Sequence, residues 1–297
     1  MYHNPVLLNE SLEALQIKPD GLYVDATFGG GGHSKHILNN LTTGHLYGFD
    51  QDIDAIHHHT KHPNLTLIQQ NFRYMINYLR FYNAIPLDGI LADLGISSHQ
   101  IDVPDRGFAT RFSSDLDMRM NQESEISAAD IVNNFGLEQL TGVFRNYGEI
   151  KNAYNLAKKI IAARDESPIN TTDQLNNIAE PLAPKKQIYK YLAQVYQALR
   201  IEVNDELGAL QDLLYQAEKV LKPGGRLVVI SYHSLEDRLV KNYLKTGNFD
   251  GKQEKDFYGN LITPFKMEKS KPIYPDETEI ETNNRARSAR LRTGIKL

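Results

Sequence analysis

The sequence predicts an α/β protein with a parallel sheet that is interrupted by a helical insertion. In the first third of the chain, short apolar runs alternate with helical patterns. A strand at Leu22–Phe28 runs directly into four consecutive glycines, Gly29 to Gly32. A purely helical stretch from about 124 to 200 then precedes a return of the alternating pattern. Such alternation is typical of βαβ units with right-handed crossovers.

The first half of the sheet can be followed element by element. Strands are predicted at 22–28, 45–49, 65–69 and 87–94, with helices near 33–41, 52–60 and 72–83. Ligands of parallel sheets bind beyond the carboxyl ends of the strands. The candidate site residues are therefore those that follow the strands: Asp25 to Gly32, Asp50, Phe72 and Asp93 to Ser98.

The pattern changes after Ser98. Residues 99–122 form a polar loop too long for a simple connection, which indicates a functional or partly mobile segment. Helices are expected at 127–134, 137–147, 153–164, 172–178 and 188–200, with Thr171 or Thr172 as one N-cap. A helix at 205–221, a strand at 226–232 and a helix from Ser234 follow, the last with a capping-box-like start. We expect core segments at 1–102 and 204–297 around an insertion at 103–203.

Composition excludes several classes of protein. The chain has 297 residues and no cysteine, so disulfides, thiolate metal sites and a cysteine nucleophile are ruled out. No apolar run approaches the ~20 residues of a membrane span, and no export signal is evident, which fits a cytoplasmic protein. The net charge is −4, but residues 282–297 are basic and contain no acidic residue. This tail either contacts phosphates or is a solvated, disordered end.

The glycine loop indicates a ligand that contacts bare backbone, since glycine permits positive φ and close approach. A dinucleotide site requires G-x-G-x-x-G and an acidic residue about 20 positions later. Asp50 satisfies the second condition, but Ser34 or Lys35 stands where the third glycine is needed. The alternative ligand is S-adenosylmethionine, which needs no pyrophosphate cradle but does need an acidic partner for its ribose. A turn required only for packing is the third, weaker reading.

Asp93 opens the second feature, Asp93-Leu-Gly-Ile-Ser-Ser98, at the end of the fourth strand. Amino-group methyltransferases often carry Asp/Asn-Pro-Pro-aromatic there, and this chain has the acid without the two prolines. A carboxylate at this place can accept a hydrogen bond from an NH₂ group and align its nitrogen. The competing interpretation of Asp93 is a turn or cap residue.

Three further clusters have open roles. Arg106-Gly-Phe-Ala and Leu116-Asp-Met-Arg-Met120 combine groups that can stack a base and grip phosphate, or simply pack their own loop. His233, at a strand–helix junction, is either a proton acceptor or a structural histidine. Four histidines, His57, His58, His59 and His62, lack the acidic pattern of a zinc helix, so no metal is expected and an exposed helix end is favoured.

Taken together, the motifs resemble those of the bacterial 16S ribosomal RNA cytosine-N4 methyltransferases of the RsmH (MraW) type. The resemblance runs nearly end to end and rests on these segments: 3–8 (HNPVLL), 24–34 (VDATFGGGGHS), 50–52 (DQD), 88–98 (DGILADLGISS), 106–108 (RGF), 116–120 (LDMRM), 197–204 (QALRIEVN), 231–238 (SYHSLEDR) and 285–289 (RARSA).

The resemblance implies a class I, Rossmann-like, S-adenosylmethionine-dependent methyltransferase with an inserted all-helical domain for substrate recognition. Its implied cofactor contacts are Gly31, Gly32, His33, Asp50, Phe72, Asp93 and Gln100. We expect catalytic roles for Asp93 and His233, and RNA contacts from Arg106, Arg119, Arg200, Arg285 and Arg287. The chain departs from the family at Asn283-Asn284 and at 191–196, which puts substrate-contact detail in question rather than the activity.

The leading hypothesis is methyl transfer to N4 of a cytidine in 16S rRNA of the small ribosomal subunit. Asp93 would hold one N–H of the amine, and His233 or water would take the proton. The alternatives are a DNA amino-methyltransferase and a non-catalytic RNA-binding protein. A non-catalytic protein would not need Asp25, the glycine loop and Asp50 together. An NAD-dependent dehydrogenase fails on the glycine spacing.

Overall fold

The computed structural model describes residues 5–57 and 62–297. It divides into two compact units. The first consists of residues 1–95 and 207–297, and the second of residues 96–206. The sequence expectation began the insertion at 103. The difference arises because Ile96 already packs against the hydrophobic core of the second unit.

The first unit contains a seven-stranded sheet in the order β3-β2-β1-β4-β5-β7-β6. The strands β1 to β5 are parallel neighbours, whereas β7 is antiparallel to both β5 and β6. Their bounds are β1 Leu22–Asp25, β2 His45–Asp50, β3 Leu65–Gln69, β4 Leu87–Asp93, β5 Leu221–Ser231, β6 Phe265–Met267 and β7 Arg290–Lys296. The five parallel strands are those that the apolar runs predict.

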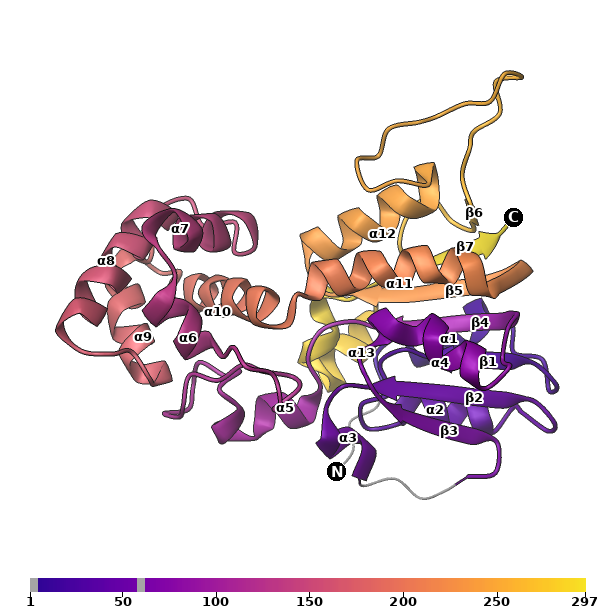
Figure 1. The fold of residues 1–297 in the computed structure, drawn as a ribbon, viewed down its shortest axis with the longest axis horizontal. Coiled ribbons are helices and arrows are strands. Elements are labelled where there is room, and N and C mark those ends of the chain that lie inside the picture. The colour runs from indigo at the N-terminus through magenta and orange to yellow at the C-terminus, as the bar shows by residue number, and fades with distance from the viewer. Residues whose placement is uncertain (1–4, 58–61) are drawn as a thin grey trace. The chain divides into compact units, whose positions relative to one another are not determined.

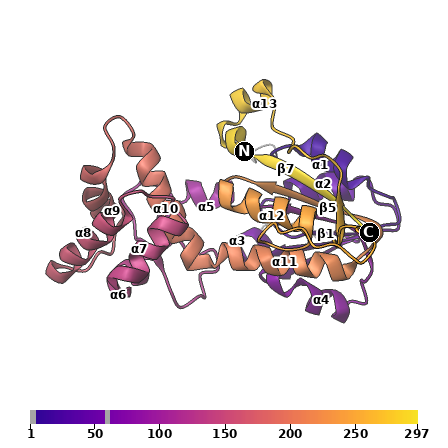
Figure 2. The ribbon, with the colours of Figure 1, turned by 90° about the horizontal axis from the view of Figure 1, so that it is seen from above.

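Helices cover both faces of this sheet, as Figure 2 shows for α1 and α2 on one side and α4 and α11 on the other. Successive strand residues point to opposite faces. In β4, Ile90 and Ala92 join the core under α4, α11 and α12, while Leu91 joins the core under α1 and α2. The helices of this unit are α1 Leu8–Leu15, α2 Gly32–Leu38, α3 Ile53–His57, η1 Phe72–Tyr74, α4 Met75–Phe81, α11 Glu206–Val220, α12 Ser234–Thr246, α13 Glu277–Thr282 and η4 Asn284–Ser288.

The basic C-terminal segment is not a free tail. Residues Arg290–Lys296 form β7, which lies between β5 and β6 in the sheet (Figure 1). Arg292 is buried and pairs with Asp237 at 2.6 Å (Nε to Oδ1) and 3.2 Å (Nη2 to Oδ2). The sequence missed this strand because its arginines alternate with apolar residues and hide the strand pattern. The disordered alternative for this end of the chain is therefore wrong.

The second unit is helical. It comprises α5 Ser98–Asp102, η2 Pro104–Arg106, α6 Ala128–Asn134, α7 Leu137–Asn146, α8 Ala153–Glu166, α9 Thr172–Ala179, η3 Glu180–Leu182 and α10 Ile188–Asn204. Its own apolar core gathers residues from the long loop, such as Leu116 and Met118, with residues from α6 to α10. Among its described residues the only β pairing is an isolated bridge between Asp115 and Thr171. Thr171 is the N-cap of α9, one of the two residues that the sequence offers for that role.

Within the described part of the chain, no helix has the length and apolar character needed to cross a membrane.

Candidate active site at the carboxyl ends of the strands

The loop after β1 is fixed to its surroundings by Asp25, a buried carboxylate at the end of that strand. Ser34 of α2 donates a hydrogen bond to Asp25 Oδ2 at 2.6 Å, and the Thr27 amide donates to Oδ1 at 3.2 Å. The Thr27 hydroxyl accepts a bond from the amide of Asp93 at 2.7 Å. Burial raises the pKa of Asp25, and the Ser34 hydroxyl opposes that shift. These bonds hold the glycine loop, α2 and the end of β4 in one arrangement.

The glycines of the loop have different physical tasks. Gly29 and Gly31 have φ of 51° and 69°, in the left-handed region that glycine adopts without strain. A Cβ built on Gly29 would have Thr27 O, 3.9 Å away, as its nearest neighbour, so the space above this backbone is open. A Cβ on Gly32 would lie 2.6 Å from Pro5 Cγ, which makes that glycine necessary for packing. The backbone at Gly29 is therefore open to a ligand, and the cofactor contacts predicted at Gly31 and Gly32 stay predictions.

Asp50 connects the end of β2 to this loop. Its Oδ2 accepts a hydrogen bond from the Gly29 amide at 2.8 Å, and its Oδ1 accepts one from the Asp52 amide at 2.9 Å. Burial raises the pKa of Asp50 to about 6, partly offset by these two amide bonds. Each carboxylate oxygen can accept a second hydrogen bond, so the group keeps capacity for a hydroxyl of a ligand.

Asp93 lies at the end of β4, next to the same loop. Its Oδ1 accepts a hydrogen bond from the Tyr232 hydroxyl at 2.7 Å, and its Oδ2 lies 3.8 Å from His33 Nδ1. Burial raises the pKa of Asp93 to about 6, while the charge of His33 and the Tyr232 hydrogen bond lower it. Burial and proximity to this carboxylate raise the pKa of Tyr232, so that the phenol stays protonated. One oxygen is thus oriented by tyrosine, and the other faces histidine.

His33 is buried, and its ring orientation is set by the backbone. Its Nε2 lies 3.0 Å from the carbonyl oxygen of Val6, which can only accept a hydrogen bond, so Nε2 carries the hydrogen. The other nitrogen, Nδ1, faces Asp93 Oδ2, and it attracts this carboxylate only when the ring is protonated, because in the neutral ring Nδ1 carries a lone pair. The predicted cofactor contact by His33 stays a prediction, and the structure adds an electrostatic contact with Asp93.

His233 caps a helix. Its Nδ1 accepts a hydrogen bond from the Glu236 amide at 3.4 Å, and its Nε2 lies 3.2 Å from Glu236 Oε1. Glu236 Oε2 in turn accepts from the His233 amide at 3.3 Å, which completes a capping box that begins at His233 rather than at Ser234. Because its lone pair is used in the cap, the geometry favours the structural interpretation of His233 over the proton acceptor.

Phe72 and Gln100 lie in different units. Phe72 begins η1 after β3 and packs, partly buried, against the main core of the sheet unit. Gln100 belongs to the helical unit and is buried, with its side chain accepting a 3.0 Å hydrogen bond from the Ser97 amide in a capping box. Their predicted cofactor contacts stay predictions.

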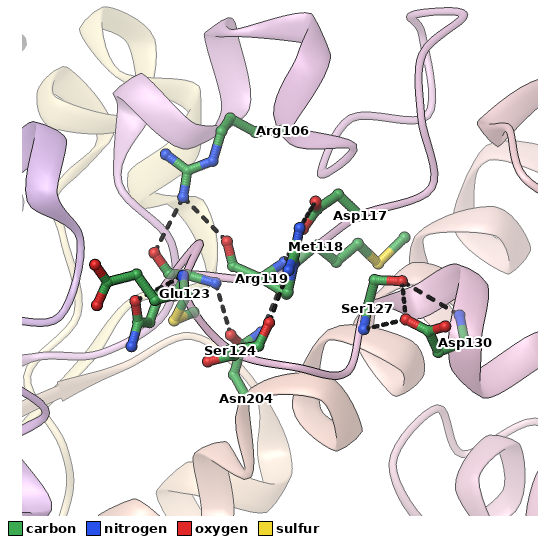
Figure 3. Close-up of polar contacts among 11 residues, drawn as sticks. Arg106, Asp117, Met118, Arg119, Glu123, Ser124, Ser127, Asp130 and Asn204 are labelled. Atoms are coloured by element: carbon green, nitrogen blue, oxygen red, sulfur yellow. Dashed lines mark hydrogen bonds and ion pairs between the residues drawn. The ribbon is translucent and has the colours of Figure 1, made fainter.

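Three of the five arginines predicted to contact RNA are occupied within the helical unit. Figure 3 shows Arg106 directed at the backbone of the long loop, where its Nη2 donates to the carbonyls of Arg119 and Met120 at 3.0 and 3.1 Å. Arg119 forms a two-bond pair with Asp117 at 2.9 and 2.7 Å. Arg200 pairs in the same way with Glu206 at 2.7 and 2.9 Å. These arginines hold their own unit together, so a phosphate contact would require them to leave those partners.

The other two arginines lie in η4, which precedes β7. Arg287 is exposed and Arg285 is half-buried. Between them, Ala286 is fully buried in the core beneath α1 and α2, which fixes this turn on the sheet. Arg287 is therefore the member of the predicted set whose side chain is most accessible to an external anion.

Tyr232 is a site residue that was not predicted from the sequence. The signal for it was present, because Tyr232 directly follows β5 and Asp93 ends β4, and these strands are parallel neighbours in the sheet. Side chains just beyond the carboxyl ends of adjacent parallel strands meet at the same edge. The histidine prediction for 57–62 falls largely outside the described residues, since 58–61 are not described. His62 Nδ1 accepts a hydrogen bond from the Asn64 amide at 3.2 Å.

The protein is Rossmann-like: five parallel strands in a mixed sheet carry helices on both faces, and a glycine loop and three acids lie at the carboxyl ends of those strands, where ligands bind. The chain matches the MraW methylase family over residues 1–296 and belongs to it. It is therefore a methyltransferase.

Curated relatives match along the whole chain. It is 54% identical over 297 residues to the "Ribosomal RNA small subunit methyltransferase H" of Christiangramia forsetii, with coverage of 100% of this chain and 98% of that protein. It is 55% identical over 295 residues to the protein of the same name from Amoebophilus asiaticus, with coverage of 99% and 95%. A solved rRNA methylase from Streptococcus thermophilus aligns over 100% of this chain and 99% of its own, at 11% identity and a TM-score of 0.44, a likeness too distant to bear on function.

Proposed function

We propose that this protein transfers a methyl group from S-adenosylmethionine to N4 of a cytidine in 16S rRNA of the small ribosomal subunit. Membership of the methylase family supports the reaction class, and the printed names of the curated relatives support the ribosomal substrate. A ribosomal substrate supports a cytoplasmic location, which is part of the proposal. The observation that carries the chemistry is Asp93, a buried carboxylate oriented by Tyr232 and tied through Thr27 to the glycine loop.

The residues at this edge fit S-adenosylmethionine. The open backbone at Gly29 admits a ligand atom where a side chain would stand, and Asp50 lies beside it with spare acceptor capacity for ribose hydroxyls. His33, Phe72 and Gln100 complete the proposed contacts. When bound, S-adenosylmethionine supplies a methyl group activated by the positive sulfur.

Asp93 is proposed to act on the amine of the target base. The cytidine N4 lone pair is delocalised into the ring, which makes the nitrogen a poor nucleophile. As a carboxylate, Asp93 accepts one N–H of that amine and so favours a pyramidal nitrogen aligned for in-line attack. The bond from N4 to the methyl carbon would form as the sulfur–methyl bond breaks, with its electron pair left on the sulfur of S-adenosylhomocysteine, and the Asp93 carboxylate would accept the proton that the amine then loses. Because a paired or stacked cytidine cannot bring N4 to a carboxylate at the end of β4, we expect the base to be turned out.

The direct test is methylation of purified small subunits or 16S rRNA with labelled S-adenosylmethionine, followed by mass-spectrometric mapping. We expect one methyl group on a cytidine N4. Asp93→Ala should lose transfer, and Asp93→Asn, which accepts a hydrogen bond but takes no proton, should retain only a small part of it. Methylation of DNA instead of rRNA would refute the substrate, and a wild-type rate with normal cofactor binding in Asp93→Ala would refute the role of Asp93.

A further inference from the structure

The helical unit carries an exposed basic segment that runs from the loop after η3 into the first turn of α10. We call residues 185–190, Lys-Lys-Gln-Ile-Tyr-Lys, the basic turn. All three of its lysines are exposed, and Tyr189 is 88% exposed. An aromatic ring this exposed contributes little to folding. Residues 181–201 contain no aspartate or glutamate, in a chain of net charge −4.

The charges of the basic turn are not used inside the protein. Among the described residues, Lys185, Lys186 and Lys190 have no ion pair and no side-chain hydrogen bond. The arginines of the same unit differ, since Arg106 and Arg119 are bound to loop carbonyls and a carboxylate. The accessible positive charge of this unit is therefore on exposed lysines, among them the three of the turn, and not on Arg106 or Arg119.

The basic turn is held in place at both ends. The Gln187 amide donates to the Pro184 carbonyl at 3.0 Å, and the Tyr191 amide donates to the Gln187 carbonyl at 2.9 Å. Asn152, at the start of α8, donates to the Leu182 carbonyl at 3.0 Å and accepts from the Tyr191 hydroxyl at 3.0 Å. Lys151, which precedes Asn152 in the chain, is exposed as well, and the acids nearest to the turn in sequence are Glu180 before it and Glu202 after it. The exposed groups are thus presented on a fixed backbone.

We propose that the basic turn binds single-stranded rRNA, with its lysines on phosphates and the Tyr189 ring stacked on an unpaired base. This inference rests on the proposed function, and it names the surface of the helical unit that binds the RNA substrate. Phosphate neutralisation by lysine supplies affinity without sequence preference, and an exposed aromatic ring supplies a platform for any base. Single-stranded RNA offers both partners, whereas in duplex RNA the bases are stacked and inaccessible to the ring.

The test compares binding of a 16S rRNA fragment by the full-length wild type and by four variants. Lys185→Gln/Lys186→Gln/Lys190→Gln removes the charges, Tyr189→Ala removes the ring and Tyr189→Phe keeps it. Lys158→Gln/Lys159→Gln removes two exposed lysines of α8 in the same unit and serves as the matched control. All changes are at exposed positions, so thermal unfolding should match that of the wild type.

We expect the triple lysine variant to lower the slope of log affinity against log salt by about 2, because each phosphate that a lysine no longer neutralises lowers it by ~0.7. Tyr189→Ala should weaken binding about 5- to 100-fold at constant salt, and Tyr189→Phe should bind like the wild type. Equal reductions in the slope per lysine removed in the triple variant and in the Lys158/Lys159 control would overturn the proposal, because the effect would then belong to overall charge. So would unchanged binding in Tyr189→Ala.

The outcome is separable from that of the proposed function. Affinity for S-adenosylmethionine, measured by calorimetry, should be unchanged in every variant of the turn. If the wild type methylates 16S rRNA and the turn variants bind and methylate it equally well, the turn inference fails and the proposed function stands. If the wild type methylates no rRNA, the proposed function fails first.

Discussion

Removing the Tyr232 hydroxyl tests how the site sets the charge of Asp93. The wild-type carboxyl has a pKa of about 6 and accepts the Tyr232 hydrogen bond at 2.7 Å. That bond favours the charged form, so Tyr232→Phe must raise the pKa of Asp93 further. A hydrogen bond to a charged group contributes about 1.5–3 kcal/mol. At 1.36 kcal/mol per unit, removing it raises the pKa by about 1–2 units, to roughly 7–8.

The consequence for activity follows from the sign of this shift. If Asp93 works as a carboxylate, the rate falls as the pH drops through its pKa. The acid limb of kcat/KM should therefore move from about 6 in the wild type to roughly 7–8 in Tyr232→Phe. At pH 7 the ionised fraction falls from ~90% to roughly 10–50%, which is a loss of about 2- to 9-fold in rate. Near pH 9 the two enzymes should be almost equal.

The assay is methyl transfer to 16S rRNA from labelled S-adenosylmethionine between pH 5 and 9. Tyr243→Phe is the matched control, because the Tyr243 hydroxyl also donates to a carboxylate, Glu218 Oε2, at 2.7 Å, but in the core under α12. That variant should lose stability and keep the wild-type acid limb. An unmoved limb in Tyr232→Phe, or a loss that is the same at every pH, would refute the reasoning.

Three other changes give independent checks. Asp93→Asn should stabilise the ligand-free protein by about 1–3 kcal/mol at pH 7.5 in urea unfolding, because a folded-state pKa raised to about 6 means that the charged form destabilises the fold above that pH. The gain should disappear below about pH 4, where the wild-type acid is protonated in both states; a gain that persists at acid pH would contradict this. Gly29→Ala and Gly224→Ala both place a Cβ in open space, but at positive φ of 51° and 79°, where a residue with a Cβ is strained. Each should therefore lower the free energy of unfolding by about 1–2 kcal/mol. Only Gly29→Ala should weaken S-adenosylmethionine binding in calorimetry. We expect a loss of about tenfold or more, since a clash of ~1.4 kcal/mol with the ligand is enough for that. Equal affinities in the two variants would show that the glycine loop does not contact the ligand. Arg106→Ala should lower the free energy of unfolding by about 2–4 kcal/mol, since it removes a buried donor to two carbonyls, while Arg111→Ala, which breaks an exposed pair with Asp102, should cost under about 1 kcal/mol. A stable Arg106→Ala with weakened RNA binding would instead favour the RNA contact predicted from the sequence.

Much of the fold could be read from the sequence, because the deciding interactions there are local. The strands at 45–49 and 65–69 and the helices of the insertion are apolar runs or helical patterns bounded by caps and turns. The spacing of Gly29 to Gly32 argued against a dinucleotide ligand without any coordinates, although the position of Asp50 fitted one. Charged strands lack such a pattern, and for that reason β7 was missed: its arginines are neutralised by Asp237, a partner far away in the sequence.

The candidate site shows the same difference between what is local in the sequence and what depends on distant residues. The sequence alone determined that acids and glycines gather after β1, β2 and β4, since chain order and the parallel sheet put those ends on one edge. Only the tertiary structure decided what each group does there. It gave Asp93 a tyrosine partner from the neighbouring strand, placed His233 in a helix cap, and directed Arg106 and Arg119 into their own loop. The physical reason is that residue type and spacing fix which groups are present, whereas hydrogen-bond partners and burial, which set charge and accessibility, come from residues distant in the chain.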